Sequence, residues 1–382
     1  MSEFFDSKDY ADYFRELEER AENKPDKDIK DNTDQPKEPV SKERKAPLGT
    51  GIRRYVKKHK AAAAAVCAAG IALAVALTSV LSAGGHRKAS ADNVSESSVP
   101  SPAAVGKTLS SAAERISVPD STPDPGEGIV SRYVLMLNAK TGEAVTARAP
   151  FERTYPASTT KIMTVLVAAE HITDYSETFN MTLEITDKMY LAEATAAGFL
   201  KDEPVTMTDL MYGTILPSGG DAALGLAFKI SGSEEAFVAL MNEKAEQLGL
   251  RDTHFTNVTG LFDKDHYTTA FDMAVIMKAA MDNQICRQVL STHPYTTAKT
   301  PQHPDGIRLE STLFSCMYGT EPETATITGG KTGYVNESGF CIASFGKANE
   351  TGNEYICITL NAAGGKWPSV NDQIALYKAY AK

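Results

Sequence analysis

Ser158 and Lys161, three positions apart, are the residues of this sequence best suited to chemistry. A spacing of i, i+3 places both side chains on one face of the helix predicted from Ser158 to about His171. The residues that follow Lys161 are apolar nearly all round, so this helix is predicted to be buried. Burial can lower the pKa of a lysine by up to about 3–5 units, and a neutral amine can take the proton of a serine nucleophile. The alternative is a lysine whose ammonium simply reaches water.

Two further motifs carry residues of the same chemical kind. Ser218 lies in the turn "LPSGGDAALGLA", where its hydroxyl either projects into a cleft or caps the following helix. Lys-Thr-Gly occurs twice. The copy at 140–142 falls in a predicted hairpin turn and needs only turn chemistry. The copy at Lys331, Thr332 and Gly333 falls on a predicted strand, where the first two side chains could line a cleft and bind a carboxylate.

The elements that must position these residues are predicted within 128–382. Strands are predicted at 132–138 and 143–148, which form a hairpin, and again at 338–346 and 354–362. Helical patterns lie between the two pairs of strands, and a closing helix starts near Pro368. One further helix is predicted to follow Thr208 as its cap, and another to begin near Gly219. A third is predicted to run from a Ser233 cap to Gly249, and a fourth to cover 268–283. Strands at both ends with helices between them favour a single α+β domain.

The segment 61–83 predicts a membrane anchor. It carries no charge over about 23 residues, enough to span a bilayer as a helix. Basic residues concentrate on its N-terminal side, which predicts a cell-membrane protein with one span, a cytoplasmic N-terminus and an extracytoplasmic domain. A cleaved signal peptide is the alternative, although the apolar run is longer than a usual signal core. The Ser/Pro-rich segment 84–127 is expected to be a linker.

The first 60 residues are predicted to form a cytoplasmic, mostly disordered tail. Within residues 1–24, aromatic and aliphatic side chains recur with helical spacing. This pattern fits either a docking helix for a cytoplasmic partner or a fraying helix without one. The formal net charge of −10 argues against a nucleic-acid partner. No cysteine or histidine spacing matches a metal site; Cys341 and Cys357, on successive predicted strands, either pair or remain free thiols.

The order and spacing of the three motifs match the penicillin-recognising serine enzymes. With the stretches "YPASTTKIMTVLVAAE", "LPSGGDAALGLAFKISGSEEAF", "DHYTTAFDMA" and "GGKTGYVNESGFCIAS", the sequence resembles the D-alanyl-D-alanine carboxypeptidases, the low-molecular-weight penicillin-binding proteins. The resemblance covers about residues 128–382. It implies a β-lactamase/transpeptidase-like catalytic domain, in which helices cover an antiparallel sheet.

The resemblance also implies roles for individual residues. Ser158 would attack the carbonyl between two terminal D-alanines of a peptidoglycan stem peptide, Lys161 would activate it, and Ser218 would relay a proton to the leaving D-alanine. Lys331 and Thr332 of the Lys-Thr-Gly strand would bind the terminal carboxylate, and Lys331 would hold down the pKa of Lys161.

In addition, the backbone N–H groups of Ser158 and Tyr334, which follows Gly333, would stabilise the oxyanion. β-Lactams would act as covalent inhibitors. No metal or other cofactor is implied, and His266 is expected to be structural.

Two departures from the family pattern bear on activity. Gly220 stands where the family usually has an asparagine, so a side-chain amide is missing from the second motif. An arginine often found near the last strand is also missing, and Lys366 is the candidate to replace it. Two alternatives to a carboxypeptidase therefore stay open: a class A-like β-lactamase, and a non-catalytic wall scaffold that keeps the fold.

Overall fold

The computed structural model describes residues 112–382. The predicted tail at 1–60, the anchor at 61–83 and most of the linker at 84–127 lie outside these residues. None of the helices within 112–382 combines the length and hydropathy needed to cross a bilayer. After the 3₁₀ turn η1 (Ala113–Arg115), the chain reaches the first strand of the main sheet at Ser131.

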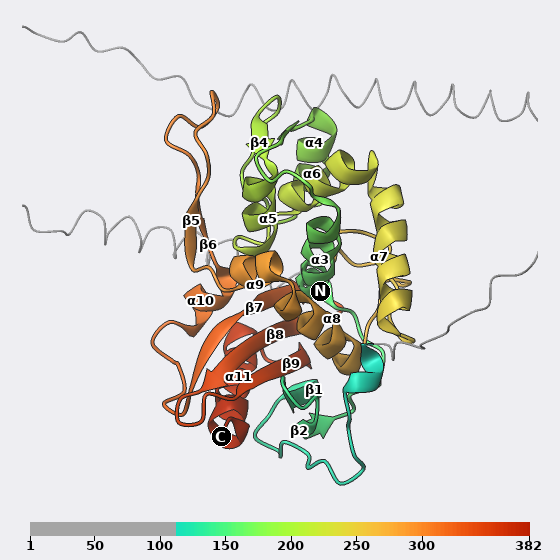
Figure 1. Ribbon diagram of the computed structural model, residues 1–382, viewed down its shortest axis with the longest axis vertical. Helices are drawn as coiled ribbons and strands as arrows, with labels where there is room; N and C mark the ends of the chain where they lie inside the picture. The colour runs from blue at the N-terminus through green and yellow to red at the C-terminus, as the bar shows by residue number, and fades with distance from the viewer. Residues whose placement is uncertain (1–111) are drawn as a thin grey trace, which may run out of the picture. The chain divides into compact units, whose positions relative to one another are not determined.

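The main sheet has five strands in the order β2-β1-β9-β8-β7, and each neighbouring pair is antiparallel (Figure 1). Its strands are β1 (Ser131–Asn138), β2 (Ala144–Arg148), β7 (Ala325–Val335), β8 (Gly339–Ala348) and β9 (Glu354–Ala362). The first two and the last three strands thus come from opposite ends of the domain. The predicted α+β class, the early hairpin and the two late strands are confirmed.

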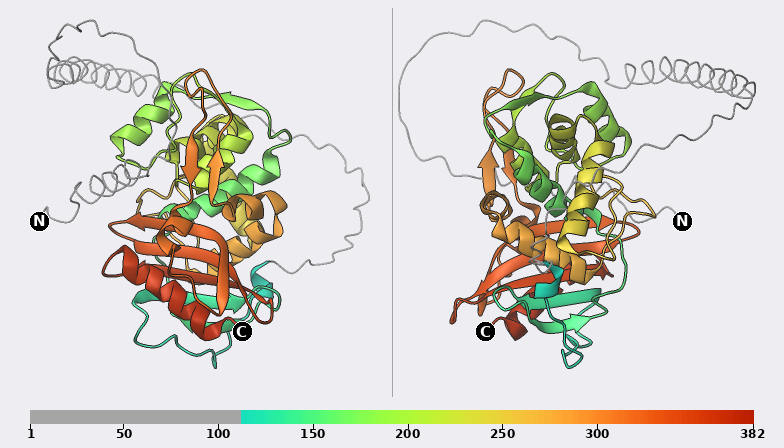
Figure 2. Two further views of the ribbon diagram at one scale, coloured as in Figure 1. Left: turned by 90° about the vertical axis from the view of Figure 1, so that its left-hand side faces the viewer. Right: turned by 45° about the vertical axis from the view of Figure 1, so that its right-hand side comes forward.

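The sheet buries both faces, because alternate side chains of a strand point to opposite sides. On β1, Leu135 and Leu137 join the core beneath the helices, whereas Val134 and Met136 join a second core. The closing helix α11 (Lys366–Tyr380) packs on this second core, along one face of β8 and β9 (Figure 2).

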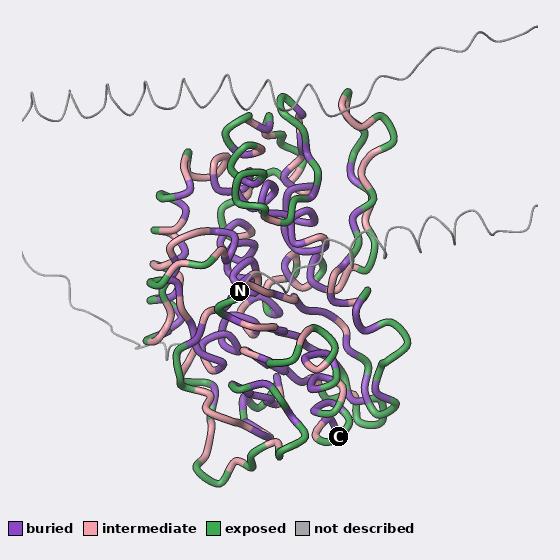
Figure 3. The backbone as a smooth tube through the Cα atoms, turned by 180° about the vertical axis from the view of Figure 1, so that it is seen from behind, coloured by how far each residue is buried: buried purple, intermediate pink, exposed green. Residues whose placement is uncertain are grey.

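The other face carries the helical part of the domain, whose buried centre is α3 (Lys161–His171) (Figures 1 and 3). Around α3 lie α5 (Met207–Ile215), α6 (Gly220–Ser231), α7 (Glu234–Leu248), α8 (Ala270–Asp282) and α9 (Gln284–Leu290). Smaller elements are η2 (Ala157–Thr160), β3 (Thr178–Asn180), α4 (Leu183–Leu191), β4 (Pro204–Thr206), β5 (Pro294–Thr296), β6 (Arg308–Glu310) and α10 (Thr312–Met317).

Helix caps agree with the sequence patterns at α7 and differ at α5. Ser233 caps α7, and Gly249 ends it in the left-handed conformation, as predicted. The cap of α5 is Thr206, which accepts a hydrogen bond from Asp209 N, so the predicted cap at Thr208 is wrong. Thr208 Oγ1 instead donates a hydrogen bond to Tyr175 O (3.0 Å), so this hydroxyl does not cap the helix.

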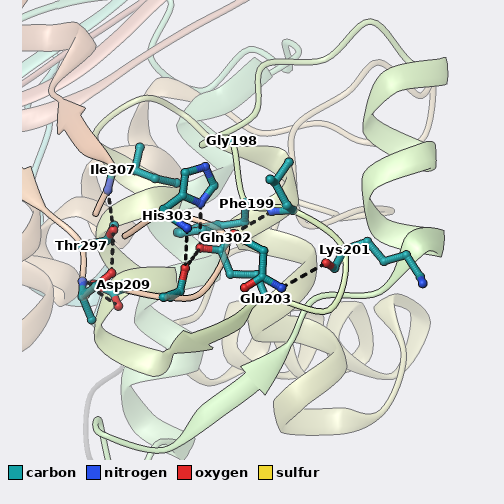
Figure 4. Close-up of polar contacts among 12 residues, drawn as sticks. Gly198, Phe199, Lys201, Glu203, Asp209, Thr297, Gln302, His303 and Ile307 are labelled. Carbon is teal, nitrogen blue, oxygen red and sulfur yellow. Dashed lines mark hydrogen bonds and ion pairs between the residues drawn. The ribbon is translucent and has the colours of Figure 1, made fainter. Parts of the chain in front are cut away.

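Two buried carboxylates fasten the arm formed by β5 and β6, residues 294–310, to the helical part. Glu203 accepts hydrogen bonds from Thr300 Oγ1 (2.7 Å) and His303 Nδ1 (2.8 Å) of the arm (Figure 4). Asp209 accepts a bond from Tyr295 Oη (2.7 Å). Because a buried carboxylate without partners is costly, these bonds keep the arm in place beside α5.

The four cysteines among the described residues are free and buried. Cys341 of β8 belongs to the core beneath the helices, and Cys357 of β9 belongs to the core beneath α11. The two thiols therefore lie on opposite faces of the sheet, and of the two alternatives the free thiols are confirmed.

Candidate active site

Ser158 and Lys161 are in contact at the start of the buried helix. Ser158 lies in the 3₁₀ turn η2, and Lys161 is the first residue of α3. Lys161 Nζ donates to Ser158 Oγ at 3.0 Å and to the backbone oxygen of Thr259 at 2.6 Å. Only 3% of Lys161 is exposed, so the ammonium does not reach water. The alternative of a lysine that extends into solvent is therefore excluded.

The environment of Lys161 favours the neutral amine. Burial lowers its pKa to about 7, while the charge of Asp221 acts in the opposite direction. Asp221 is itself buried, and its carboxylate accepts backbone N–H bonds from Ala197, Gly198 and Phe199. Near neutral pH, a large fraction of Lys161 can thus hold a free lone pair beside the Ser158 hydroxyl, as a general base requires.

The second Lys-Thr-Gly motif lies on β7 and faces η2. Lys331 is 1% exposed, and its Nζ donates to the backbone oxygen of Thr332 at 2.7 Å. Burial lowers the pKa of Lys331 well below its ordinary value, and the nearby charge of Lys161 lowers it further. The prediction was the reverse, that Lys331 lowers the pKa of Lys161; burial causes the shift at Lys161, and Lys331 is not among its causes.

Close backbone packing holds the nucleophile turn against β7. A Cβ on Gly333 would lie 2.8 Å from Ser158 N and 3.0 Å from Thr159 N, so only a glycine fits there. On its other side, a Cβ on Gly260 would overlap Ala157 O. Ala157 adopts a positive φ of 48°, a strained conformation for an alanine, directly before Ser158. The Ser158 amide is therefore fixed beside the strand that carries Tyr334.

Ser218 lies in the turn between α5 and α6, and it is buried with a left-handed φ of 66°. No hydrogen bond joins it to Ser158 or Lys161 within residues 112–382. The turn is nevertheless part of the site's surroundings, because a Cβ on Gly220 would lie 3.4 Å from Cγ2 of Thr259, whose carbonyl holds Lys161.

Met189 of α4 fills the space beside Gly220. A Cβ on Gly220 would overlap Met189 Sδ and would lie 3.4 Å from Thr259 Cγ2. The space beside the position of the missing amide is thus filled by a buried thioether.

His266, expected to be structural, supports the nucleophile turn. Thr256 N donates to its Nδ1 (3.1 Å), so Nε2 carries the proton and donates to Thr160 Oγ1 (2.8 Å). Burial lowers the pKa of His266 to about 4, which keeps the ring neutral. Thr160 follows Ser158 by two residues, so the ring fixes the end of η2.

Two other lysines singled out in the sequence lie apart from these contacts. Lys140 of the first Lys-Thr-Gly copy donates its backbone N–H to Asn138 Oδ1, the turn chemistry that was predicted. Lys366 is exposed at the start of α11, its Nζ 5.4 Å from the centre of the Trp367 ring, and no hydrogen bond links it to Thr332.

Sequence reasoning missed Thr259, Met189 and Thr312, which lie against residues of the site, and Asp221, whose charge acts on Lys161. Thr259 acts through a backbone carbonyl, which leaves no signal in residue type. Asp221 had a signal, since an acidic residue at the start of a predicted helix is visible in the sequence.

A serine hydroxyl in contact with a buried lysine, between a helical part and an antiparallel strand, defines a serine–lysine acyl-transfer site. The family model for D-alanyl-D-alanine carboxypeptidase matches residues 120–364. The chain therefore belongs to the D-alanyl-D-alanine carboxypeptidase family.

Individual relatives agree with this assignment. The chain is 30% identical to D-alanyl-D-alanine carboxypeptidase DacF of Bacillus subtilis over 223 residues, 57% of this chain and 54% of the relative. It is 33% identical to the D-alanyl-D-alanine carboxypeptidase of Streptomyces sp. strain K15 over 213 residues, 54% of this chain and 72% of the relative. The chain thus spans about half the length of the Bacillus relative.

Solved structures confirm the predicted transpeptidase-like α+β fold. The Streptomyces K15 DD-transpeptidase matches with a TM-score of 0.59 and 28% identity, covering 66% of this chain and 97% of that one. Penicillin-binding protein 5 from Haemophilus influenzae has a TM-score of 0.58 at 24% identity, over 65% of this chain and 70% of that chain, and supports the fold alone.

Proposed function

We propose that this chain is a serine-type D-Ala-D-Ala carboxypeptidase that removes the terminal D-alanine from peptidoglycan stem peptides. The observation that carries the proposal is the 3.0 Å contact between Lys161 Nζ and Ser158 Oγ in a buried setting. Family membership and the names of the relatives support the choice of substrate.

The reaction begins when Ser158 Oγ attacks the carbonyl carbon between the two D-alanines and its proton passes to Lys161 Nζ. The carbonyl oxygen gains the negative charge, and the amides of Ser158 and Tyr334 stabilise it. As the C–N bond breaks, Ser218 relays a proton to the departing amine. Water then attacks the ester on Ser158, which releases the shortened peptide and restores the hydroxyl.

The residues of β7 orient the substrate. Thr332 and Lys331 act at the terminal carboxylate, while Gly333 lets β7 approach the nucleophile. β-Lactams present a carbonyl and a carboxylate in the same relative positions, so they acylate Ser158 and act as covalent inhibitors.

The domain and localisation predictions extend the proposal to the rest of the chain. Residues 61–83 anchor the protein in the cell membrane by a single span, with 1–60 in the cytoplasm. The linker 84–127 connects the anchor to the catalytic domain 128–382 outside the cell, and residues 1–24 bind a cytoplasmic partner. The uncharged run at 61–83 and its basic N-terminal flank support this topology.

Labelling with a fluorescent penicillin and a D-alanine release assay test the activity together. The full chain should form a stable adduct and release D-alanine from a stem pentapeptide. Ser158→Ala should abolish both, and Lys161→Ala should nearly do so. Rapid turnover of the penicillin would instead indicate a class A-like β-lactamase. Absence of labelling would indicate a non-catalytic scaffold, and labelling that survives Ser158→Ala would mean a different nucleophile.

A further inference from the structure

Thr312 brings a second hydroxyl to the strand expected to bind the substrate carboxylate. Its Oγ1 lies 2.8 Å from Oγ1 of Thr332, within a hydrogen bond in which either oxygen can donate. Both residues are half-buried, so the pair is neither sealed in the core nor freely hydrated. A substrate carboxylate that reaches Thr332 therefore meets two hydroxyl groups rather than one.

The position of Thr312 is fixed by hydrogen bonds to two different segments. It is the first residue of α10, and its backbone N–H donates to Leu216 O at 2.9 Å. Leu216 directly precedes the turn that carries Ser218. Thr312 is thus hydrogen-bonded through its backbone to Leu216, beside the Ser218 turn, and through its side chain to β7.

Lys331 is poorly placed for a direct contact with a carboxylate. Its side chain is almost fully buried, and its ammonium is bonded to the backbone oxygen of Thr332. The hydrogen-bond donors nearer the surface are the two hydroxyls.

We propose that Thr312 is a positioning residue that orients the Thr332 hydroxyl toward the carboxylate of the substrate; this inference rests on the proposed function. The two hydroxyls hold two protons, and their mutual bond uses one. A carboxylate only accepts, so it selects the arrangement in which Thr312 donates to Thr332 and Thr332 donates to the substrate. Such a chain of bonds strengthens the terminal donor, and it fixes the rotation of its hydroxyl.

The test compares two probes that differ only at the carboxylate: a fluorescent penicillin as the free acid, and the same penicillin as its methyl ester. The measured quantity is the ratio of the second-order rate constants for labelling of Ser158 by acid and by ester. Thr312→Val, nearly the same shape without the hydroxyl, should lower this ratio about tenfold, the order expected for a hydrogen bond to a charged group. Thr312→Ser should restore the ratio.

A double variant tests whether Thr312 acts through its partner. Thr332→Val should lower the ratio at least as far as Thr312→Val, and combining both should add little to Thr332→Val alone. Thr320→Val is the matched control, because its hydroxyl binds Met317 O at the other end of α10. It should leave the ratio unchanged.

The outcomes separate this inference from the proposed function. If wild type labels with neither probe, the proposed function fails. If wild type labels and Thr312→Val slows the acid and the ester equally, the threonine has only a structural role and the inference is wrong. An unchanged ratio in Thr312→Val, or fully additive losses in the double variant, would overturn it as well.

Discussion

Acylation of Ser158 should depend on pH with a midpoint near 7, because Lys161 must be neutral to take the serine proton. Burial lowers the pKa of Lys161 from 10.5 to about 7. With that value, about 90% of Lys161 is neutral at pH 8 and about 1% at pH 5. Lowering the pH from 8 to 5 should therefore slow acylation about 90-fold, with a tenfold loss per unit well below the midpoint.

The assay is the second-order rate constant for labelling by a fluorescent penicillin, measured from pH 5 to 9. This constant reports the pKa of the free enzyme rather than that of a complex. Asp221→Asn should move the midpoint below 7, since the Asp221 charge raises the pKa of Lys161. Lys140→Met, in the exposed copy of Lys-Thr-Gly, should leave the profile unchanged.

Two results would refute this reasoning. A rate that stays level between pH 5 and 8 would mean that no group with a pKa near 7 activates Ser158. A midpoint near 10 would mean that Lys161 titrates like a lysine in water and that its burial has no electrostatic effect. Thermal unfolding of each variant at every pH must accompany the rates, so that loss of structure is not counted as loss of a base.

Three shorter predictions concern the same site. Buried Lys161 loses its proton near pH 7 and the unfolded chain near 10.5, so the free energy of unfolding should rise with pH across that window. Urea titrations should show a steeper rise in wild type than in Lys161→Met, which keeps the contribution of buried Lys331, and an equal slope in both would contradict the prediction. Gly220→Asn should lower stability by about 1–3 kcal/mol through overlap with Met189, and Met189→Ala should relieve the loss; an unrelieved loss in the double variant would exclude that contact as the cause. Gly333→Val should slow penicillin labelling of Ser158 more than tenfold, since its Cβ would lie 2.8 Å from the Ser158 amide nitrogen. Normal labelling would mean that β7 need not approach so closely.

Local sequence patterns predicted the elements that depend only on residues near one another in the sequence. The early hairpin, the α7 boundaries at Ser233 and Gly249, and the contact between Ser158 and Lys161 each depend on neighbours a few positions apart. The cap of α5 shows the limit of this approach. Thr206 and Thr208 are equally good caps by type, and the choice between them depends on Tyr175 O, which lies far away in the sequence.

The parts of the site that sequence analysis missed depend on contacts between distant segments. Thr259 supplies a carbonyl 98 residues after Lys161, and Thr312 meets Thr332 across 20 residues. Short α4 was also missed, because only Ile185 and Met189 of its nine residues are buried and its apolar face is too narrow to stand out.

The burial of Lys161 makes the proposed activity possible and also destabilises the fold. A shift of the pKa from 10.5 to about 7 means that burying the protonated amine lowers the free energy of unfolding by about 5 kcal/mol below pH 7. That is a large share of the 5–15 kcal/mol by which domains are usually stable. The turn must therefore be held by other contacts, and it is: Gly333 and Gly260 pack against it on two sides, and His266 bonds its end. A site that relied on Ser158 and Lys161 alone would relax until the ammonium reached water and could no longer act as a base.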